Sequence, residues 1–572
     1  MNRPHFFRPS WVCILLFLST GLAIIKAHGE TIIIGGGPGS LAWEGQFSEV
    51  SVIDFETDPG QIRPIQNSPE DNIALKILER GGSVTSPNAR IVLEISDAES
   101  IVLLNHMISG DRSRAFEVKG INAVGIIIDI DLGQRFAVNR LRFFTRENFE
   151  DFFLKGYEIS LNDGTEEQRT LAGTPDFRLF KTVGRNTKPI VEENIPLQFV
   201  RFIKMKQLVR GEWEIDEIEI FGEGFASEAS YTSKVFDQKQ PAVFGGISWT
   251  GGNIGEPTKA GVTLATRSGT SPDPSDLSAW SNWSPPYPSG LSSTIESPAP
   301  RQYFQFRFQF TSGDIFSAAT VDSLEFELSP ALADSVLGEV WPQNAFIGQD
   351  TTFTYAVKSF GSRGFDRLQI ETLAPVDVVR SVEIDGTEVD IDFENTEDGL
   401  QINFPRIVGD STLRVEFDSI ALQYNTVFSG KVSDGTKPDN LPQVVVAGDA
   451  VPQADGDDLS VTILVGKNLL HSMNVASAIT PNGDGVNDEI RITYDIVNLT
   501  HTAPISISVY DLAGRLVKKI YSGTDTSGRY QQVWDGTNDS GEQIIPGIYL
   551  VHLEIEADSG TEGKMAIVSL VY

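Results

Sequence analysis

The sequence has almost no cysteine and very little histidine. Its one cysteine, Cys13, lies in an apolar run near the N-terminus, and its six histidines are scattered along 572 residues. Without that run the chain can form no disulfide, so packed cores alone must stabilise its domains. It contains neither a Cys/His cluster nor an HExxH motif, which argues against a zinc site.

Basic residues are also in deficit. The 45 lysines and arginines stand against 78 aspartates and glutamates, which gives a net charge of −33. A surface this acidic repels phosphate backbones and anionic lipid, so we exclude nucleic acid as a main partner. The same surface suits an exported soluble protein and attracts divalent cations.

Long apolar runs are absent except for one at the N-terminus. That run covers residues 11–25, follows Arg3 and Arg8, and leads into small or polar residues. A basic start, a short apolar run and small residues after it are typical of a secretory signal peptide, which we place at residues 1–29. The alternative is an uncleaved N-terminal anchor. Once the signal is cleaved, we expect no insertion into a lipid bilayer.

Convincing long amphipathic helices are scarce, whereas 52 glycines and 29 prolines separate short apolar runs of period two. This pattern predicts an all-β fold class with tandem β-sandwiches, and the length requires several of them. After the signal peptide we predict these units: a glycine- and proline-rich segment (30–69), a first β-domain (70–224), a β-sandwich (225–330), an Ig-like β-sandwich (331–465) and a C-terminal domain (466–572).

The glycine run after the leader has two interpretations. In residues 32–40 an apolar triplet runs into GGGPGS, which places Gly35 and Gly37 as in a dinucleotide-binding turn. Such a site needs a helix of several turns and further βα units, but Gly45 interrupts that helix and a proline-rich loop follows. We favour the alternative, a glycine loop at the N-terminus of a β-domain.

The first β-domain carries clear strand patterns. INAVGIIIDIDLGQRFAVNRLRFFTR (121–146) alternates in its centre, YEISLNDG (157–164) ends in an Asp-Gly turn, and WEIDEIEIFGEG (213–224) changes phase at Asp216–Glu217, which predicts a bulge. Together with VRFIKMK, these segments resemble a discoidin or coagulation factor 5/8 type C domain, a galactose-binding-like jelly roll. The resemblance implies that loops at one end of the sandwich bind a glycan or another surface polymer, without catalysis.

Two loops of this domain hold candidate ligand-binding residues. SGDRSRAFE (109–117) supplies planar hydrogen-bond donors and RENFEDFFLKG (146–156) supplies aromatic faces, the combination that sugar recognition uses. The alternative, which we favour, is that the phenylalanines pack under their own loop and the arginines are solvated. The candidates are Arg112, Arg114, Phe149, Phe152 and Phe153.

A tryptophan-rich loop lies in the second sandwich. SAWSNWSPPYPSG (278–290) contains Trp280, Trp283 and Tyr287 and resembles a segment of β-sandwich modules from bacterial surface proteins. The three rings either form a sugar-stacking platform or cap the edge of the sandwich, and we favour the cap.

The C-terminal domain carries the most specific resemblance. VYDLAGRLV, WDGTNDSG and PGIYLVHLEI are similar to the Ig-like domain of the flagellar hook-capping protein, and TPNGDGVND is similar to the start of the sorting domains of type IX secretion. The resemblance implies export, with secretion machinery or an outer-membrane component as partner. We therefore expect the protein to be secreted or to lie on the outer cell surface.

The same domain has a loop rich in oxygen ligands. Four side chains crowd into seven residues, which suits calcium, although the EF-hand spacing and its bidentate glutamate are absent. Asx-turns explain the same residues without a metal. The candidate ligands are Asn482, Asp484, Asn487 and Asp488, and Ca²⁺ is the one cofactor that the sequence suggests.

Catalytic motifs are missing. The chain has no G-x-S-x-G elbow, and all its regions have the size of small accessory sandwiches. We predict a protein that is not an enzyme and that binds a glycan or another surface polymer. A purely structural scaffold of spacer domains is the alternative, followed by a polysaccharide-active enzyme with two convergent carboxylates.

Overall fold

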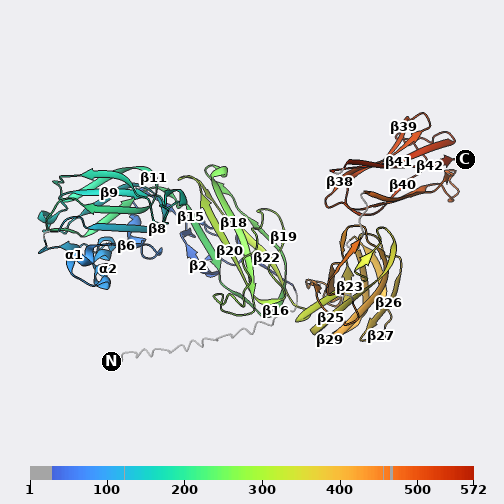
Figure 1. Cartoon of the computed structure of the whole chain (residues 1–572), viewed down its shortest axis with the longest axis horizontal. Coiled ribbons are helices and arrows are strands. Elements are labelled where there is room, and N and C mark those ends of the chain that lie inside the picture. Colours follow the sequence, from blue (N-terminus) through green and yellow to red (C-terminus); the bar gives the residue numbers. More distant parts are fainter. Residues whose placement is uncertain (1–28, 122, 398, 455, 464–467, 559) are drawn as a thin grey trace, which may run out of the picture.

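The computed structural model describes residues 29–121, 123–397, 399–454, 456–463, 468–558 and 560–572. The predicted signal peptide, apart from Gly29, lies outside the described residues. Strands make up 54% of the structure and helices 6%, so the prediction of an all-β chain of tandem sandwiches is confirmed. Figure 1 shows the sandwiches in a row. No helix within the described residues combines the length and apolar character needed to span a membrane.

The first β-domain is organised around two long strands, β8 and β11, that pair antiparallel. Their register shifts between Asn194 and Gln198 and again between Val200 and Phe202, and such shifts bend a sheet. The sheet order is β10-β9-β11-β8-β13, with β6 also on β8, and β12 pairs separately with β7. The strands are β6 (Ser83–Thr85), β7 (Phe116–Val118), β8 (Ile127–Phe144), β9 (Tyr157–Asn162), β10 (Arg178–Val183), β11 (Ile190–Gln207), β12 (Trp213–Ile215) and β13 (Glu217–Phe221).

Two short helices interrupt the strands of this domain. Helix α2 starts at a serine cap, since the Ser96 hydroxyl accepts a hydrogen bond from the Glu99 amide at 3.2 Å. The helices are α1 (Ala89–Leu93) and α2 (Asp97–Asn105). The 3-10 turns of the domain are Ile73–Lys76, His106–Ile108, Glu150–Phe152 and Glu166–Gln168.

The second sandwich is built from two separate parts of the sequence. Its large sheet has the order β1-β22-β16-β20-β15-β2, with β18 on β20 and β19 on β16. Both ends of this order come from the segment that we expected to stand apart as residues 30–69. The strands are β1 (Glu30–Gly35), β2 (Phe47–Ser51), β15 (Glu228–Ser233), β16 (Phe236–Thr250), β17 (Asn253–Ile254), β18 (Ala260–Gly269), β19 (Ser293–Thr294), β20 (Arg301–Ser312), β21 (Ala318–Ala319) and β22 (Ser323–Pro330).

The N-terminal segment thus contributes strands to the sandwich predicted at residues 225–330, for a physical reason. Strand β1 pairs antiparallel with β22, in the register Ile34 to Leu324, and β2 pairs with β15. An edge strand exposes unpaired amides and carbonyls, and the N-terminal strands cover both edges. The chain then crosses to the first β-domain through the short pairs β3 (Ile53–Asp54) with β4 (Arg63–Pro64) and β5 (Gln66–Asn67) with β14 (Gly224–Phe225).

The glycine run is a turn of this sandwich, as the favoured interpretation predicted. Gly35 has a φ of +75°, and a Cβ there would collide with the Asp322 carbonyl oxygen and the Trp43 indole. Only a 3-10 turn, Trp43–Gly45, follows the glycines. The strand before them pairs antiparallel, so the helix and parallel sheet of a dinucleotide site are not formed here.

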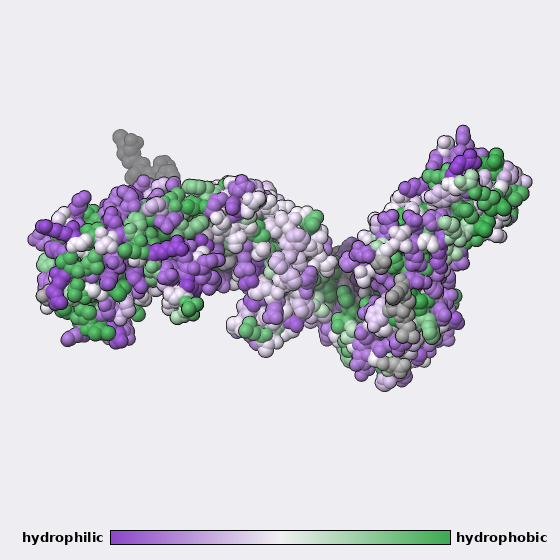
Figure 2. All heavy atoms as spheres, turned by 45° about the horizontal axis from the view of Figure 1, so that its top comes forward, coloured by the Kyte–Doolittle hydropathy of each residue, from purple (hydrophilic) through white to green (hydrophobic). Residues whose placement is uncertain are grey.

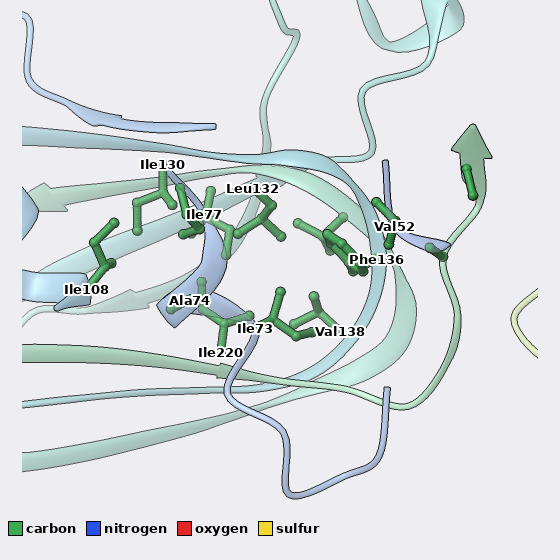
Figure 3. Close-up of a cluster of buried hydrophobic side chains, with 14 of the residues drawn as sticks. Val52, Ile73, Ala74, Ile77, Ile108, Ile130, Leu132, Phe136, Val138 and Ile220 are labelled. Atoms are coloured by element: carbon green, nitrogen blue, oxygen red, sulfur yellow. The ribbon is translucent and has the colours of Figure 1, made fainter. Parts of the chain in front are cut away.

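The first β-domain and the second sandwich share one hydrophobic core. Figure 3 shows part of it, where Val52 from the N-terminal segment lies near Phe136 and Val138 of β8, and Ile73 and Ile77 cover the same strand. The shared core continues through Trp43 and the phenylalanines of β20. These two domains are therefore packed as one unit.

The third sandwich has its own core and is dominated by two very long strands, β25 and β29, paired antiparallel. The larger sheet has the order β27-β26-β29-β25-β23-β33, and a smaller one the order β24-β34-β30. The strands are β23 (Ser335–Trp341), β24 (Asn344–Ala345), β25 (Asp350–Ile370), β26 (Val379–Ile384), β27 (Thr387–Glu388), β28 (Asp392–Thr396), β29 (Gly399–Ile420), β30 (Asn425–Val427), β31 (Gly430–Ser433), β32 (Gln443–Val444), β33 (Val446–Ala447) and β34 (Ser460–Ile463).

The C-terminal domain is a sandwich of a three-stranded sheet, β35-β37-β40, and a five-stranded sheet, β36-β42-β41-β38-β39. Its core is separate and contains Trp534 and Tyr549. The strands are β35 (Leu470–Val475), β36 (Ala478–Ile479), β37 (Ile490–Ile496), β38 (Ala503–Asp511), β39 (Leu516–Asp525), β40 (Gly528–Trp534), β41 (Gly547–Ala557) and β42 (Gly560–Leu570). Figure 2 shows hydrophilic and hydrophobic residues interspersed over the visible face of the whole chain.

Candidate functional site

Three acidic residues are buried where the last strand of the first β-domain changes phase. The chain leaves β12 at Ile215 and enters β13 at Glu217, so the predicted irregularity takes the form of a break at Asp216 between two strands with different partners. Glu214 and Asp216 are fully buried and Glu217 is 2% exposed. Buried carboxylates need partners, and the neighbouring loops supply them.

Arg146 and Lys119 neutralise the first of these acids. Arg146 donates from Nε to Oε1 of Glu214 at 3.1 Å and from Nη2 to Oε2 at 2.7 Å, and Nζ of Lys119 lies 3.1 Å from the same Oε2. Burial by itself would raise the pKa of Glu214, but the hydrogen bonds from both cations outweigh it and hold that pKa below its usual value. Both cations also pair with Glu117.

Phe149 and Phe152 lie over this ion-pair cluster, and their ring centroids are 6.4 Å apart. Nζ of Lys119 lies 4.5 Å from the centroid of Phe149 and 4.9 Å from that of Phe152, and Cζ of Arg146 lies 4.4 Å from Phe149. These distances are in the range of cation–π contacts. Phe149 is 37% exposed and Phe152 is half-buried.

The other predicted residues lie in different surroundings. Arg112 donates from Nε to Asp216 Oδ2 at 2.7 Å and lies over Phe144, with Cζ 3.9 Å from the ring centroid. Arg114 pairs with Asp111 on its own exposed loop, and Phe153 packs against Lys155. The structure thus brings two of the five predicted residues together and gives Arg112 a structural partner.

Glu217 is a buried carboxyl group with few hydrogen-bond partners to stabilise its charge. Oε2 accepts a hydrogen bond from the Gly110 amide at 3.0 Å, while Oε1 is buried without a hydrogen-bond partner. Burial, and then repulsion from Asp216 and Glu219, raises the pKa of Glu217 to about 7, although Arg112 acts in the opposite direction. This group therefore changes its protonation near neutral pH.

A cavity of about 300 Å³ opens at the other end of β9. The loop 145–156 leads into β9 at Tyr157, whereas Leu161 and Asn162, at the end of the strand, line the cavity. Its wall combines two aromatic rings with guanidinium, amide and carboxylate groups. The lining residues are Arg135, Leu161, Asn162, Asp163, Gln168, Arg178, Leu179, Phe180, Gln198 and Phe199.

Hydrogen bonds within the loop fix one side of this cavity. Asn162 donates to the carbonyl oxygens of Gln168 and Asp176 at 2.7 and 2.8 Å, and Gln168 Nε2 donates to Asp163 Oδ2 at 3.0 Å. On the opposite side Cζ of Arg135 lies 5.0 Å from the ring centroid of Phe199. The exposed guanidinium of Arg178 has no ion pair or side-chain hydrogen bond to a described residue, so its donors face solvent at the mouth.

The sequence analysis did not predict this cavity, although it identified two of the segments that line it. YEISLNDG contributes Asn162 and Asp163, and the strand around FVRFIK contributes Phe199. The sequence offered one clue to it. The alternation of this strand places the aromatic ring of Phe199 on the face opposite the buried residues, where a large apolar side chain is unexpected. The pairing of β9 with β10 and of β11 with β8, which closes the wall, is not local information.

The predicted calcium loop satisfies its own oxygen atoms. Asp488 accepts hydrogen bonds from the amides of Gly483 and Gly485, both at 2.7 Å, and Asn482 and Asp484 accept from amides two residues ahead. The first of these bonds contributes most to lowering the pKa of Asp488. Asn487 has a left-handed φ of +54°. These are the Asx-turns of the alternative interpretation, and the choice of calcium stays a prediction.

Another acidic cluster lies in the third sandwich. Carboxylate oxygens of Glu339, Asp449 and Asp457 lie within 4.8 Å of one another, and Glu339 is buried. Oε1 of Glu339 accepts a hydrogen bond from the Ala450 amide at 3.2 Å. Burial raises the pKa of Glu339, and repulsion from the two aspartates adds to the effect.

The aromatic loop of the second sandwich is divided between two roles. Trp280 and Tyr287 are each 5% exposed and cap the sandwich, as we favoured. Trp283 is half-buried and lies against Arg267 and Arg307, with each Cζ 4.5 Å from its ring.

Comparison with protein families identifies the C-terminal domain. Residues 473–570 match the CHU_C type IX secretion signal domain. The predicted sorting-domain resemblance is thereby confirmed, and the protein is exported to the cell surface or secreted. The type IX signal also implies an interaction with the secretion machinery.

Solved structures similar to the chain include sugar-binding modules. A chitosan-binding module from Paenibacillus sp. IK-5 is 17% identical, with a TM-score of 0.20, over 26% of this chain and 98% of the module. A fucose-binding module of Streptococcus pneumoniae is 18% identical, with a TM-score of 0.20, over 29% and 100%. A Clostridium perfringens module in complex with GalNAc-β-1,3-galactose is 16% identical, with a TM-score of 0.19, over 25% and 97%. Curated proteins gave no significant match.

Proposed function

We propose that this exported protein binds a polysaccharide through its first β-domain, in the cavity at the end of β9. The observation that carries the proposal is the composition of that cavity, in which Phe180 and Phe199 lie among amides, a carboxylate and two guanidinium groups. A sugar ring has an apolar C–H face that packs on an aromatic ring, while its hydroxyls need planar donors and acceptors around the edge.

Hydrogen bonds already hold several side chains of the cavity in place, which supports a preformed site. The turn that carries Asn162 and Asp163 is held by its own hydrogen bonds, so these side chains need no reordering on binding. The Arg178 guanidinium at the mouth is free to donate to a hydroxyl. A cavity of about 300 Å³ is at the small end of ligand sites, which favours one sugar unit of a chain over a large aglycone.

The loop with Phe149 and Phe152 is retained as the second candidate site for the same function. Phe149 is the most exposed of the predicted aromatic rings, and cations lie beside it. Against this site, Arg146 and Lys119 are already bound to buried Glu214, so their donors are largely occupied.

The test is binding of the full chain without its leader to a panel of immobilised neutral polysaccharides. We expect Phe180→Ala and Arg178→Ala each to weaken binding about tenfold or more, and Phe152→Ala to leave it within about twofold. Arg112→Ala is a second loop variant. Because it leaves Asp216 buried without its partner, its melting temperature must be measured alongside.

Each outcome decides between the candidates. Loss of binding with Phe152→Ala alone would move the site to the loop. If the unaltered protein binds none of the polysaccharides, the proposal fails and the domains act as a structural scaffold. Release of reducing ends from any polysaccharide would instead indicate an enzyme.

A further inference from the structure

The outer face of the second sandwich carries a polar stripe across strands β18 and β20. On β20, Phe304, Phe306, Phe308 and Phe310 point into the core and are at most 1% exposed, so the intervening residues belong to the opposite face. The register places Gln309 opposite Thr263, Arg307 opposite Ala265, and Gln305 opposite Arg267. Figure 1 shows β15, β20 and β18 side by side in this sandwich.

One end of the stripe is hollowed. A cavity of about 480 Å³ lies between the middle of strand β8, which carries Gln134, and the strands of the second sandwich, and it is lined by Ser230, Thr263, Gln309 and Thr311 among others. Nε2 of Gln134 donates to Ser51 at 2.6 Å, while Oε1 is buried without a hydrogen-bond partner. The hollow thus presents hydroxyls and amides together with the carboxylate of Glu228, which can accept hydrogen bonds from sugar hydroxyls.

The other end of the stripe holds two arginines that flank Trp283. Cζ of Arg267 and Cζ of Arg307 each lie 4.5 Å from the Trp283 ring, and Arg267 also lies 5.0 Å from Trp280. Neither arginine forms an ion pair with a described residue. Arg267 donates from Nε and Nη2 to the amide oxygen of Gln305, at 2.8 and 2.6 Å, and Nε of Arg307 is buried without an acceptor.

Two unpaired guanidinium groups on one ring are unusual in a chain of net charge −33. Burial lowers the pKa of both arginines, and for Arg267 the charge of Arg307 lowers it further. Glu49 acts on Arg307 in the opposite direction and raises its pKa, although no ion pair joins the two within the described residues. The two guanidinium groups still repel each other, and an anion bound between them would offset that repulsion. Apart from the Arg267 donors that bind Gln305 and the buried Nε of Arg307, the in-plane N–H groups of the two stacked guanidinium groups can donate to a planar or tetrahedral anion.

The hollow and the arginine pair are in line. Gln309 and Arg307 are successive outward positions of one strand, and Arg267 lies on the neighbouring strand opposite Gln305, which is itself buried. From Gln309 to the level of Arg267 the stripe extends about 14 Å at roughly 3.4 Å per residue. A ligand that uses both ends must be extended, must carry hydroxyls for the hollow and must carry an acid group for the arginines. A small inorganic anion would leave the hollow unused, and a nucleic acid would meet the acidic surface around two cations.

We propose that this stripe is a second ligand site, which binds an acidic polysaccharide through carboxylate or sulfate groups on the Arg267–Arg307 pair and hydroxyls in the hollow around Gln309. The site belongs to a different domain from the β9 cavity and does not depend on it.

The experiment compares binding of the full chain without its leader to polygalacturonate, dextran sulfate and neutral dextran. We expect measurable binding to one or both acidic polymers, and a loss of at least tenfold in the double variant Arg267→Gln/Arg307→Gln. Preference for polygalacturonate would assign the anion as carboxylate, and preference for dextran sulfate would assign it as sulfate. Arg185→Gln, an exposed arginine of the other domain, is the charge-matched control and should change binding less than twofold.

A second variant guards against misfolding of the arginine double variant. Thr263→Glu changes an exposed strand position of the hollow and should weaken binding of the acidic polymers severalfold at an unchanged melting temperature. Arg178→Ala should leave acidic-polymer binding intact, which separates this site from the β9 cavity. The proposal is overturned if both the double variant and Thr263→Glu bind as the unaltered protein does, if neutral dextran competes as well as the acidic polymers, or if neither acidic polymer binds.

Discussion

The two halves of the molecule are assembled differently. The C-terminal domain is one continuous stretch of chain with its own core around Trp534, and the third sandwich likewise has a core of its own. The first β-domain and the second sandwich share a single core, and the chain passes through the second sandwich twice. The difference shows that domain boundaries cannot be read from contiguous sequence patterns when a domain takes its edge strands from a distant part of the chain.

The largest expected effect comes from removing residues 30–51. Without β1 and β2 the second sandwich would expose both edges of its sheet, β22 and β15, and lose part of the shared core. We expect this variant to aggregate or to lose its cooperative melting transition. By contrast, residues 468–572 expressed alone should fold, as measured by circular dichroism and size-exclusion chromatography. A monomeric, fully stable 30–51 deletion would show that the borrowed strands are dispensable.

Matched tryptophan variants sharpen the same comparison. Trp43 and Trp534 are each 1% exposed and each donate an indole hydrogen bond at 3.0 Å, to Gly60 and Thr537 carbonyl oxygens respectively. Replacing either by alanine should cost about 3–5 kcal/mol of stability. Trp43→Ala should lower the melting of the first β-domain and the second sandwich together, whereas Trp534→Ala should lower only the C-terminal transition. Calorimetry that resolves separate transitions would check this, and independent melting of the first two domains would contradict the shared core.

The junction between the third sandwich and the C-terminal domain should respond more weakly. It includes a small cluster in which Val497 packs against Ala374, Ile420 and Leu422, and backbone hydrogen bonds from Asn498 to Leu422 and from Arg529 to Leu373. Val497→Asp places a charge in this cluster and should loosen the junction while leaving both cores folded. Small-angle scattering should report a broader distribution of shapes, and Val497→Leu is the matched control. An unchanged scattering profile would mean that other contacts hold the two domains.

The smallest effect concerns pH. Glu217 titrates near pH 7 in the folded protein against an ordinary value of 4.5, so between these values the folded state binds more protons than the unfolded state. Its contribution to stability is therefore lost as pH rises through this window. Glu217→Gln should raise the melting temperature of the shared unit at pH 7 by a few degrees and flatten its pH dependence. The exposed Glu167→Gln should do neither, and an identical slope in both variants would remove Glu217 as the cause.

Much of the fold was predictable because sheet faces have a period of two. The alternation around YFQFRFQF identified β20, and the phase change at Asp216 marked the break between β12 and β13. The turn at Gly35 and the self-satisfied loop at Asp488 also followed from local backbone chemistry. These features depend on residues that are close together in the chain.

The candidate sites were less accessible from sequence. Arg112 was a reasonable sugar-binding residue by type, but its partner is the buried Asp216, 104 residues away. The β9 cavity and the Arg267–Arg307 pair form only where strands from distant segments pair side by side.

The sequence by itself determined that this is an exported all-β protein whose last domain is a type IX secretion signal, because alternation and motif spacing are local properties of the chain. The tertiary structure alone decided that residues 30–51 complete the second sandwich, and which polar side chains face a cavity and which neutralise a buried charge. Strand partners, burial and charge pairing depend on contacts between residues that are far apart in the chain, and no local pattern records them.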